Sequence, residues 1–311
     1  MNKRHVLNPY WLACLAMLSI DTCAADAAAD PWVLKLTPLF SYVGYGGSPL
    51  RSDMVSTGAY LAADYRDRLS LVGGATYTRL NYKAGIAAIN QADEYLSARL
   101  HLNPDVLPGR LSLRLDGHQI NNNDSTNESN DVQVVAPQVS FLSRAQSLYL
   151  DLGYAASFYG KSNSGNGPLT VQQWTPTLGL GFNENADWLQ LRLYDVSASN
   201  TARAMRGHTD AVELKLTHYF APQAVWLPRW VSVGGLAGNR MYAVDGDTAV
   251  VYNLADEQKG GGFVAAQWQL AAHYKATLST GYDVYQTRDT GTGNRYTYSG
   301  AHMYLGVTAQ W

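Results

Sequence analysis

The chain has 311 residues, with 23 basic and 25 acidic side chains. This near balance argues against nucleic acid as a partner, and a total of two cysteines excludes a disulfide-rich scaffold. Tyrosine (21 residues) and tryptophan (8) are abundant beside only six phenylalanines. Their rings carry a polar tip, which suits a surface between lipid and water.

The first residues predict a cleavable export signal. Lys3 and Arg4 give a basic start, residues 11–20 form an apolar run, and small residues follow, which is the order found in a secretory signal peptide. A run of about ten residues is too short for a membrane-spanning helix. We predict cleavage after Ala24, with Ala29 as a later alternative.

This cleavage makes residues 1–24 a signal peptide and leaves residues 25–311 as one domain. It removes both cysteines. Lipidation of Cys23 is the competing interpretation, but the residues before it match a lipidation motif poorly. The remaining chain holds no run long and apolar enough for a transmembrane helix, and no internal repeat or linker.

Alternation of apolar and polar residues dominates the rest of the chain. Clear examples are residues 111–116, 148–154, 189–194 and 212–217. Successive side chains of a strand point to opposite faces, so each of these runs places its leucines on one face. A helix would scatter the same leucines around its axis. The pattern predicts an all-β protein, either a soluble sandwich or a transmembrane barrel.

Strand length and loop length favour the barrel. The predicted runs have ~10 residues or more, whereas soluble strands average ~5–6. Short turns and longer polar connections also alternate, the longer ones lying near 46–54, 120–130, 161–168, 200–208 and 245–260. Short turns on one side and long loops on the other are typical of outer-membrane barrels.

We predict a transmembrane antiparallel up-and-down β-barrel of about 14 strands, within a range of ~12–16. The predicted strands are 31–44, 55–65, 69–81, 93–102, 110–119, 132–142, 147–159, 170–182, 187–197, 209–220, 229–242, 261–273, 277–288 and 295–311.

The chain ends on an alternating strand with an aromatic last residue. Counting back from the end, the apolar positions are Trp311, Ala309, Val307, Leu305 and Met303. This resembles the C-terminal strand of Gram-negative outer-membrane β-barrel proteins, although Phe is the more usual last residue. The resemblance implies that these five residues form an insertion signal for the barrel-assembly machinery. It covers the mature chain as porin-like architecture and identifies no specific family.

Charged residues in the predicted strands fall opposite the leucine and valine face. They are Lys35, Arg99, Arg114, Asp116, Asp151, Arg192, Glu213, Lys215 and Asp283. A charge that faces lipid costs ~2–4 kcal/mol at mid-membrane, so we expect these side chains to line the lumen. Such groups either pair and stiffen the wall or form a constriction that selects solutes. Their mixed signs predict weak charge selectivity.

Small residues occupy many other inward positions. Examples are Ser112, Gly153, Ala155, Gly179 and Gly281, and we expect them to leave the lumen open. Inward tyrosines either fill space or form a track for a sugar; they are Tyr149, Tyr159, Tyr194, Tyr298 and Tyr304. The polar tract 121–130 is expected to be a solvated, mobile extracellular loop because its composition offers little apolar surface to bury.

No catalytic group is recognisable. Outer-membrane phospholipases share a His-x-Ser pair, which is lacking in this sequence. Omptin proteases use Asp and His at the extracellular rim, and the candidates for that role are His118, Asp195, His208 and Asp210. Their spacing does not single them out. We therefore predict no enzyme activity, no cofactor and no metal site.

The leading functional hypothesis is an outer-membrane channel of a Gram-negative bacterium for passive diffusion of small hydrophilic solutes. The alternatives are an accessory barrel of an export or surface-polysaccharide assembly system and, third, a barrel enzyme. The expected partners are outer-membrane lipid, the periplasmic and outer-membrane barrel-assembly machinery and a small hydrophilic solute. Architecture alone does not decide among these functions.

Overall fold

A computed structural model describes residues 31–83, 85–102, 107–221, 224–288 and 293–311. The predicted signal peptide and its cleavage site lie outside these residues. Trp32–Trp311 form one compact unit. Among the described residues, no helix is long and apolar enough to cross a membrane.

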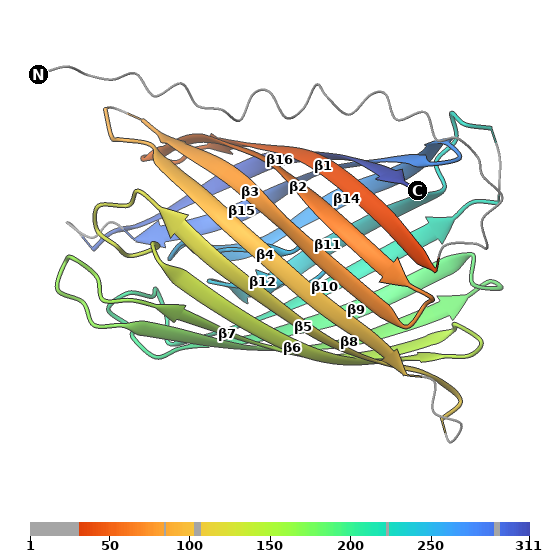
Figure 1. Cartoon of the computed structure of the whole chain (residues 1–311). Helices are drawn as coiled ribbons and strands as arrows, with labels where there is room; N and C mark the ends of the chain where they lie inside the picture. Colours follow the sequence, from red (N-terminus) through yellow and green to blue (C-terminus); the bar gives the residue numbers. More distant parts are fainter. Residues whose placement is uncertain (1–30, 84, 103–106, 222–223, 289–292) are drawn as a thin grey trace, which may run out of the picture. The chain divides into compact units, whose positions relative to one another are not determined.

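Fourteen long strands close into an antiparallel barrel (Figure 1), so the predicted fold and strand number are confirmed. Each strand pairs with its neighbours along the chain, and β1 pairs with β16 to close the ring. The strands are β1 (Trp32–Gly46), β2 (Arg51–Tyr65), β3 (Leu69–Tyr82), β4 (Ile89–Leu102), β5 (Gly109–Asn122), β6 (Val132–Ser143), β7 (Leu148–Tyr159), β8 (Leu169–Phe182), β9 (Asp187–Ala198), β10 (His208–Tyr219), β11 (Trp230–Arg240), β14 (Glu257–Ala271), β15 (Tyr274–Arg288) and β16 (Arg295–Gln310).

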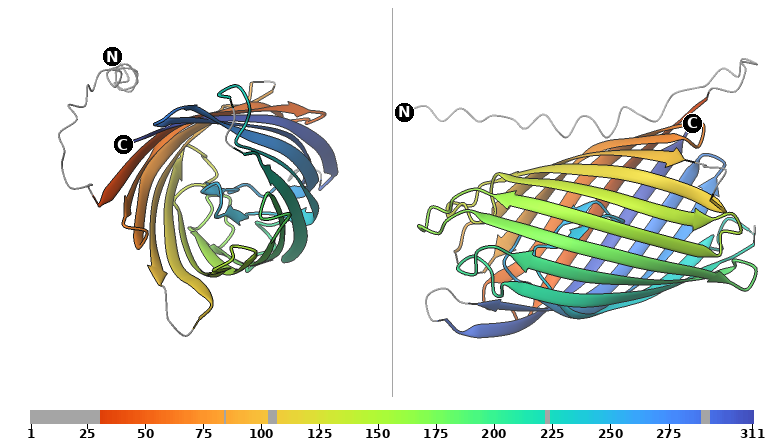
Figure 2. Two further views of the ribbon diagram at one scale, coloured as in Figure 1. Left: turned by 90° about the vertical axis from the view of Figure 1, so that its right-hand side faces the viewer. Right: turned by 90° about the horizontal axis from the view of Figure 1, so that it is seen from below.

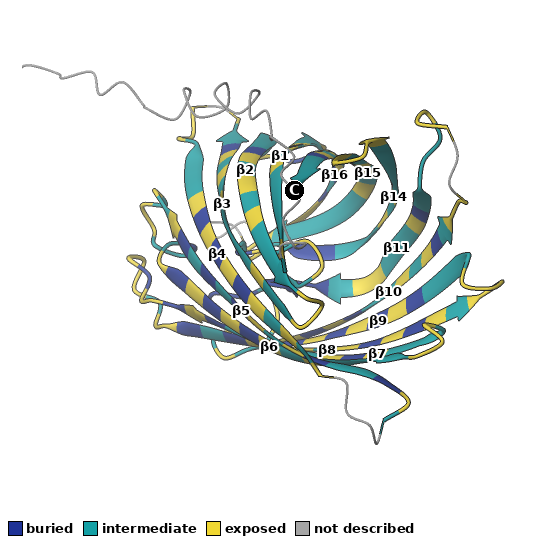
Figure 3. Ribbon diagram, turned by 45° about the vertical axis from the view of Figure 1, so that its right-hand side comes forward, coloured by how far each residue is buried: buried dark blue, intermediate teal, exposed yellow. Residues whose placement is uncertain are grey.

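The outer face of the barrel is an aliphatic belt. Along β9, Leu191 and Leu193 are 38% and 45% exposed, whereas Arg192 and Tyr194 between and beside them are nearly buried. Figure 3 shows the same alternation of exposed and buried residues along strand after strand. A soluble protein rarely exposes so much contiguous apolar surface, whereas a transmembrane barrel presents it to lipid.

The two ends of the barrel differ in their connections. At the end where the barrel sequence starts and finishes, the strands are joined by tight turns such as 66–68 and 183–186. Arg66, Asp67 and Asn183 adopt positive φ there. Most of the longer connections lie at the other end, whereas residues 220–229 form a long connection between β10 and β11 at the end with the tight turns. Strands β2, β5 and β14 start earlier or run further than predicted, so they extend into segments assigned to loops.

The last strand has the predicted facing. Met303 and Leu305 of β16 are each 41% exposed on the outer face, and Trp311 exchanges backbone hydrogen bonds with Leu34 of β1. The role of this strand as an insertion signal remains a prediction.

Several inward glycines are covered by a neighbouring side chain. A Cβ atom on Gly179 would meet the Trp188 ring at 2.5 Å, and one on Gly281 would meet His302 at 2.5 Å. On Gly74 it would collide with the ring of Tyr60. The expectation that small inward residues leave the lumen open is therefore wrong at Gly179 and Gly281, because a ring lies across the space.

Candidate functional site

The connection between β11 and β14, residues 241–256, folds into the barrel (Figure 2). We call it the inner loop. It carries a short hairpin of β12 (Val244–Asp245) and β13 (Val250–Val251). Met241, Tyr242 and Ala243 are at most 2% exposed, so the wall encloses them. The long connection predicted near residues 245–260 therefore lies inside the barrel, and its last residues, 257–260, belong to β14.

An apolar patch on the inner wall explains why the loop turns inward. The patch comes from β5 to β9 and consists of Ile120, Val132, Val134, Ala155, Val171 and Val196, all at most 4% exposed. Met241, Tyr242, Val244 and Val251 of the inner loop belong to the same apolar cluster. Each buried aliphatic side chain contributes ~1.5–3 kcal/mol, so the loop is more stable inside the lumen than in water.

Hydrogen bonds fix the loop against the patch. The buried Gln173 side chain accepts a hydrogen bond from Val244 N at 2.9 Å and donates one to Val244 O at 2.7 Å. Both backbone groups of Val244 are therefore bonded to the barrel wall. Arg114 donates to the carbonyl of Gly246 at 2.8 Å. The loop backbone is therefore held by side chains from β5 and β8.

Two carboxylates of the loop meet two cations of the wall. Arg192 lies 2.7 Å from Asp247 and 3.6 Å from Asp245, and Lys215 lies 3.4 Å from Asp247. Burial alone would raise the pKa of Asp247. The nearby cations Arg192 and Lys215 lower this pKa by more than burial raises it, so the net pKa lies well below its usual range. The ionised loop is the stable form.

Residues at both ends of the inner loop bond to residues at the rim of the barrel. Asp256 forms an ion pair with Arg51 and accepts a hydrogen bond from Tyr298. Tyr242 donates to the carbonyl of Arg203 at 2.6 Å. The Arg203 guanidinium lies 2.6 Å from Glu128. The inner loop is thus joined to the neighbouring rim loops.

The polar tract 121–130 takes part in this rim. Glu128 accepts hydrogen bonds from Ser162, Ser164 and Asn166, and Asp124 accepts from Ser129. Burial acts to raise the pKa of Glu128, but these donors and Arg203 lower it below its usual value. The predicted picture of a freely solvated loop is therefore incomplete, since part of the tract is bound to other loops.

Six of the nine predicted lumen residues gather around the inner loop. They are Arg114, Asp116, Asp151, Arg192, Glu213 and Lys215. Arg114 pairs with Asp116 at 2.7 Å, and Asp151 accepts from Gln138 at 2.5 Å. Asp116, Asp151 and Arg192 of this group line, together with Asp247, a pocket of about 40 Å³, which holds only a few waters.

Of the other three predicted lumen residues, Lys35 of β1 and Asp283 of β15 lie away from this group, and Arg99 of β4 lies beside it. Lys35 pairs with Asp64 at 2.7 Å, and Asp283 lies 3.1 Å from His302. Arg99 lies opposite Arg114 in the register of β4 and β5. The role of all nine residues in solute passage stays a prediction.

The inner wall therefore has two parts. We call β4 to β10 the covered arc, because residues 244–247 of the inner loop contact it and its inward residues such as Asp116, Gln173 and Arg192 are buried. At the rim the loop also contacts the other side of the barrel, where Asp256 pairs with Arg51 of β2. We call β14 to β16 with β1 to β3 the open arc. Its inward residues Thr37 and Tyr304 keep intermediate exposure. This division was not predicted from the sequence, although residues 134–136 are apolar on both faces of the strand.

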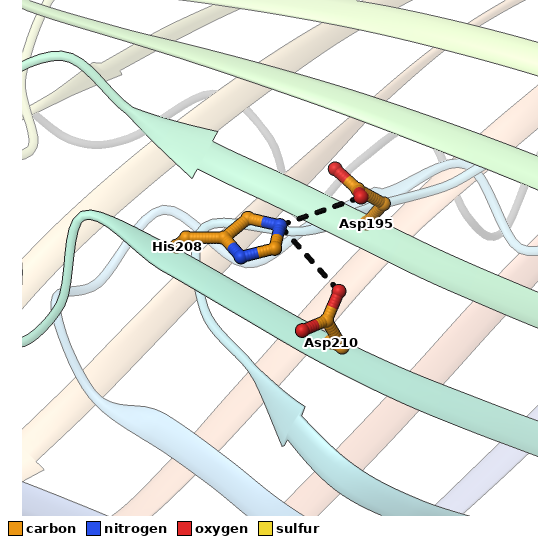
Figure 4. A group of neighbouring side chains, drawn as sticks. All are labelled: Asp195, His208 and Asp210. Atoms are coloured by element: carbon orange, nitrogen blue, oxygen red, sulfur yellow. Dashed lines mark ion pairs between the residues drawn. The ribbon is translucent and has the colours of Figure 1, made fainter.

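The four residues considered for an omptin-like role are not brought together. His118 points into the barrel, where its Nδ1 lies 3.1 Å from Asp93. Asp195, His208 and Asp210 form a separate group on the outer face of β9 and β10 (Figure 4). A rim site that combines the four is therefore not formed.

No protein-family model matches the sequence, and no curated protein sequence matches it. Among solved structures, the monoaromatic hydrocarbon channel CymD is similar at TM-score 0.51 and 10% identity, over 91% of this chain and 89% of that one. A Pseudomonas aeruginosa FadL homologue is similar at TM-score 0.50 and 8% identity, over 91% and 90%. OmpT of Vibrio cholerae gives TM-score 0.47 at 10% identity, over 91% and 99%.

At these identities the similarity concerns the fold. A closed 14-stranded barrel with an aliphatic outer belt is the architecture of outer-membrane channels. The chain is an outer-membrane β-barrel protein, channel-like in architecture, as the sequence predicted.

Proposed function

We propose that the barrel is a channel for passive diffusion of small hydrophilic solutes, which move along the open arc beside the inner loop. The observation that carries this proposal is the contrast between the two arcs. On the covered arc the inner loop lies against the wall, beside a pocket of about 40 Å³ lined by Asp116, Arg192 and Asp247. The open arc presents small polar groups, such as the hydrogen-bonded pair Thr37 and Thr308, with intermediate exposure.

The lining favours neutral or weakly charged hydrophilic solutes. Lys35 is paired with Asp64, and Asp283 with His302, so both signs are present along the open arc. Such pairing supports weak charge selectivity. CymD is named a hydrocarbon channel; hydrophilic solutes are favoured here because hydroxyls and ion pairs line the open arc.

In this proposal the longer loops face outward and residues 1–24 are removed on export. The barrel-assembly machinery then inserts the chain through its last strand. Mass spectrometry of the N-terminus of the mature protein tests the cleavage after Ala24, and an intact N-terminus would contradict it.

Single-channel conductance in planar bilayers tests the channel. We compare the refolded wild type with a variant in which residues 242–255 are replaced by a short Gly-Ser linker. We expect small, stable openings for the wild type in two different salts, and severalfold larger openings for the variant because the lumen is cleared. Heat-modifiable migration on gels confirms that both are folded. Two folded but silent proteins would overturn the proposal and favour an accessory barrel of an export system.

A further inference from the structure

We propose that Asp195, His208 and Asp210 form a binding site for a divalent transition-metal ion, with zinc as the best fit, on the outer face of the barrel. His208 Nε2 lies 3.3 Å from Asp195 Oδ2 and 3.4 Å from Asp210 Oδ1. All three potential ligand atoms lie within 4.8 Å of one another. Figure 4 shows the imidazole between the two carboxylates.

The strand register places two like charges face to face. Asp195 of β9 and Asp210 of β10 are direct cross-strand partners. Like charges at such positions destabilise a sheet. Among the described residues, the ion pairs of both carboxylates are with His208 alone. One imidazole neutralises at most one of the two carboxylates, so a bound cation would relieve the remaining repulsion.

The spacing fits zinc. Two ligands at ~2.0–2.1 Å from a tetrahedral zinc ion lie ~3.3–3.4 Å apart, which matches both distances from His208 Nε2. One imidazole nitrogen and two carboxylate oxygens fill three positions, and water fills the fourth. Magnesium and calcium prefer six or more oxygen ligands, whereas imidazole suits zinc, copper and nickel.

The site lies where the aliphatic belt ends. One step along the same face, Leu193 lies opposite Val212, and the next pair is Leu191 with Leu214. Trp174 of β8 is the cross-strand partner of Asp195 and packs on Tyr154 at 4.8 Å. Aromatic residues of this kind mark the interface between lipid and water. A bound cation would compensate two carboxylates that lie close to lipid.

The sequence analysis predicted no metal site because the histidines are dispersed. His208 and Asp210 are two residues apart and therefore share a strand face. Asp195 joins them only through the hairpin register, which a spacing motif does not contain.

The test is zinc titration of the tag-free, refolded barrel by isothermal calorimetry after chelator treatment. We expect one equivalent to bind. Asp195→Asn, His208→Gln and Asp210→Asn should each lower the affinity about ten-fold or more, since even outer-shell partners of a metal change affinity by ~10–100-fold. Glu94→Gln, an exposed acid on the outer face of β4, and His273→Gln, an exposed histidine, should bind like the wild type.

Gel migration with and without heating confirms that each variant is folded. A wild type that binds no zinc, or an affinity unchanged in the three site variants, would overturn the proposal. The test does not involve conductance, so it stands apart from the test of the channel.

Discussion

The covered and open arcs have the same strand geometry and the same outward belt, yet they differ on the inside. The covered arc carries an apolar inner patch near the rim, with Val134 and Val196 in it, and buried charges such as Arg192 next to the patch. The open arc carries small polar groups and exposed pairs such as Lys35 with Asp64. The inner wall of a single barrel therefore forms two surfaces that differ in polarity and burial. One binds a segment of its own chain, and the other keeps inward residues of intermediate exposure.

The largest effect is expected from breaking the ionic contact that belongs to the covered arc. Arg192→Ala leaves Asp245 and Asp247 without their main cation, and breaking a buried pair costs ~3–5 kcal/mol. We expect the lower end of that range because Asp247 is 41% exposed. The inner loop should detach from the covered arc, and single-channel conductance should rise toward that of the loop-shortened variant.

The matched substitution on the open arc is Lys35→Ala, which removes a cation paired with one carboxylate. Its conductance should stay close to that of the wild type. Equal effects of the two substitutions would remove the distinction between the arcs.

Low pH should weaken the contact between the inner loop and the covered arc, as Arg192→Ala does, but with a smaller effect on conductance. The pKa of Asp247 in the folded barrel is below its ordinary value of 3.8 because of Arg192 and Lys215. Its stabilisation of the loop is therefore complete above the ordinary pKa and is lost as pH falls through the lowered pKa. Conductance should be constant from about pH 8 to pH 5 and rise below about pH 4.

Asp247→Asn provides the control for this titration, since its conductance should already be raised at neutral pH and change less with acid. A rise centred near pH 6.5, where histidine titrates, would assign the effect to another group.

The smallest effect is expected from one added methyl group. Gly306→Ala on the open arc places a Cβ 2.7 Å from the Tyr304 hydroxyl, and Gly179→Ala on the covered arc places one 2.5 Å from the Trp188 ring. In each case a ring must move. Conductance should fall slightly for Gly306→Ala alone, because the Tyr304 ring is displaced toward the open lumen. An equal or larger fall for Gly179→Ala would place the path of solutes along the covered arc.

The fold could be predicted because its cause is local. Residues that alternate over ten or more positions must have one apolar face, and runs such as 189–194 form the strands they predict. Strand ends were less certain. Polar residues such as Asn121 and Asn122 continue β5 beyond the apolar run, since backbone pairing with β4 does not require apolar side chains.

The inner loop could not be predicted in the same way. Its position depends on Asp247 meeting Arg192 and Lys215, and on Val244 meeting Gln173, which are contacts over 32 to 71 residues of chain. The sequence of a long polar connection does not differ recognisably between one that lies inside a barrel and one that lies outside. Asp195, His208 and Asp210 were named from the sequence only as candidates for an omptin-like role, with no metal site predicted, and only the register of β9 and β10 shows that these three lie together.

The order of the chain gives the inner loop a consequence for assembly. Its main wall partners, Arg114, Gln173, Arg192 and Lys215, all precede it in the sequence. Closure of the ring, by contrast, pairs positions as distant as Lys35 and Gln310, and such long-range pairing is slow. The loop can therefore bind a curved, still open sheet and hold its strands together from within. We infer that the inner loop stabilises the nascent barrel before the first and last strands meet.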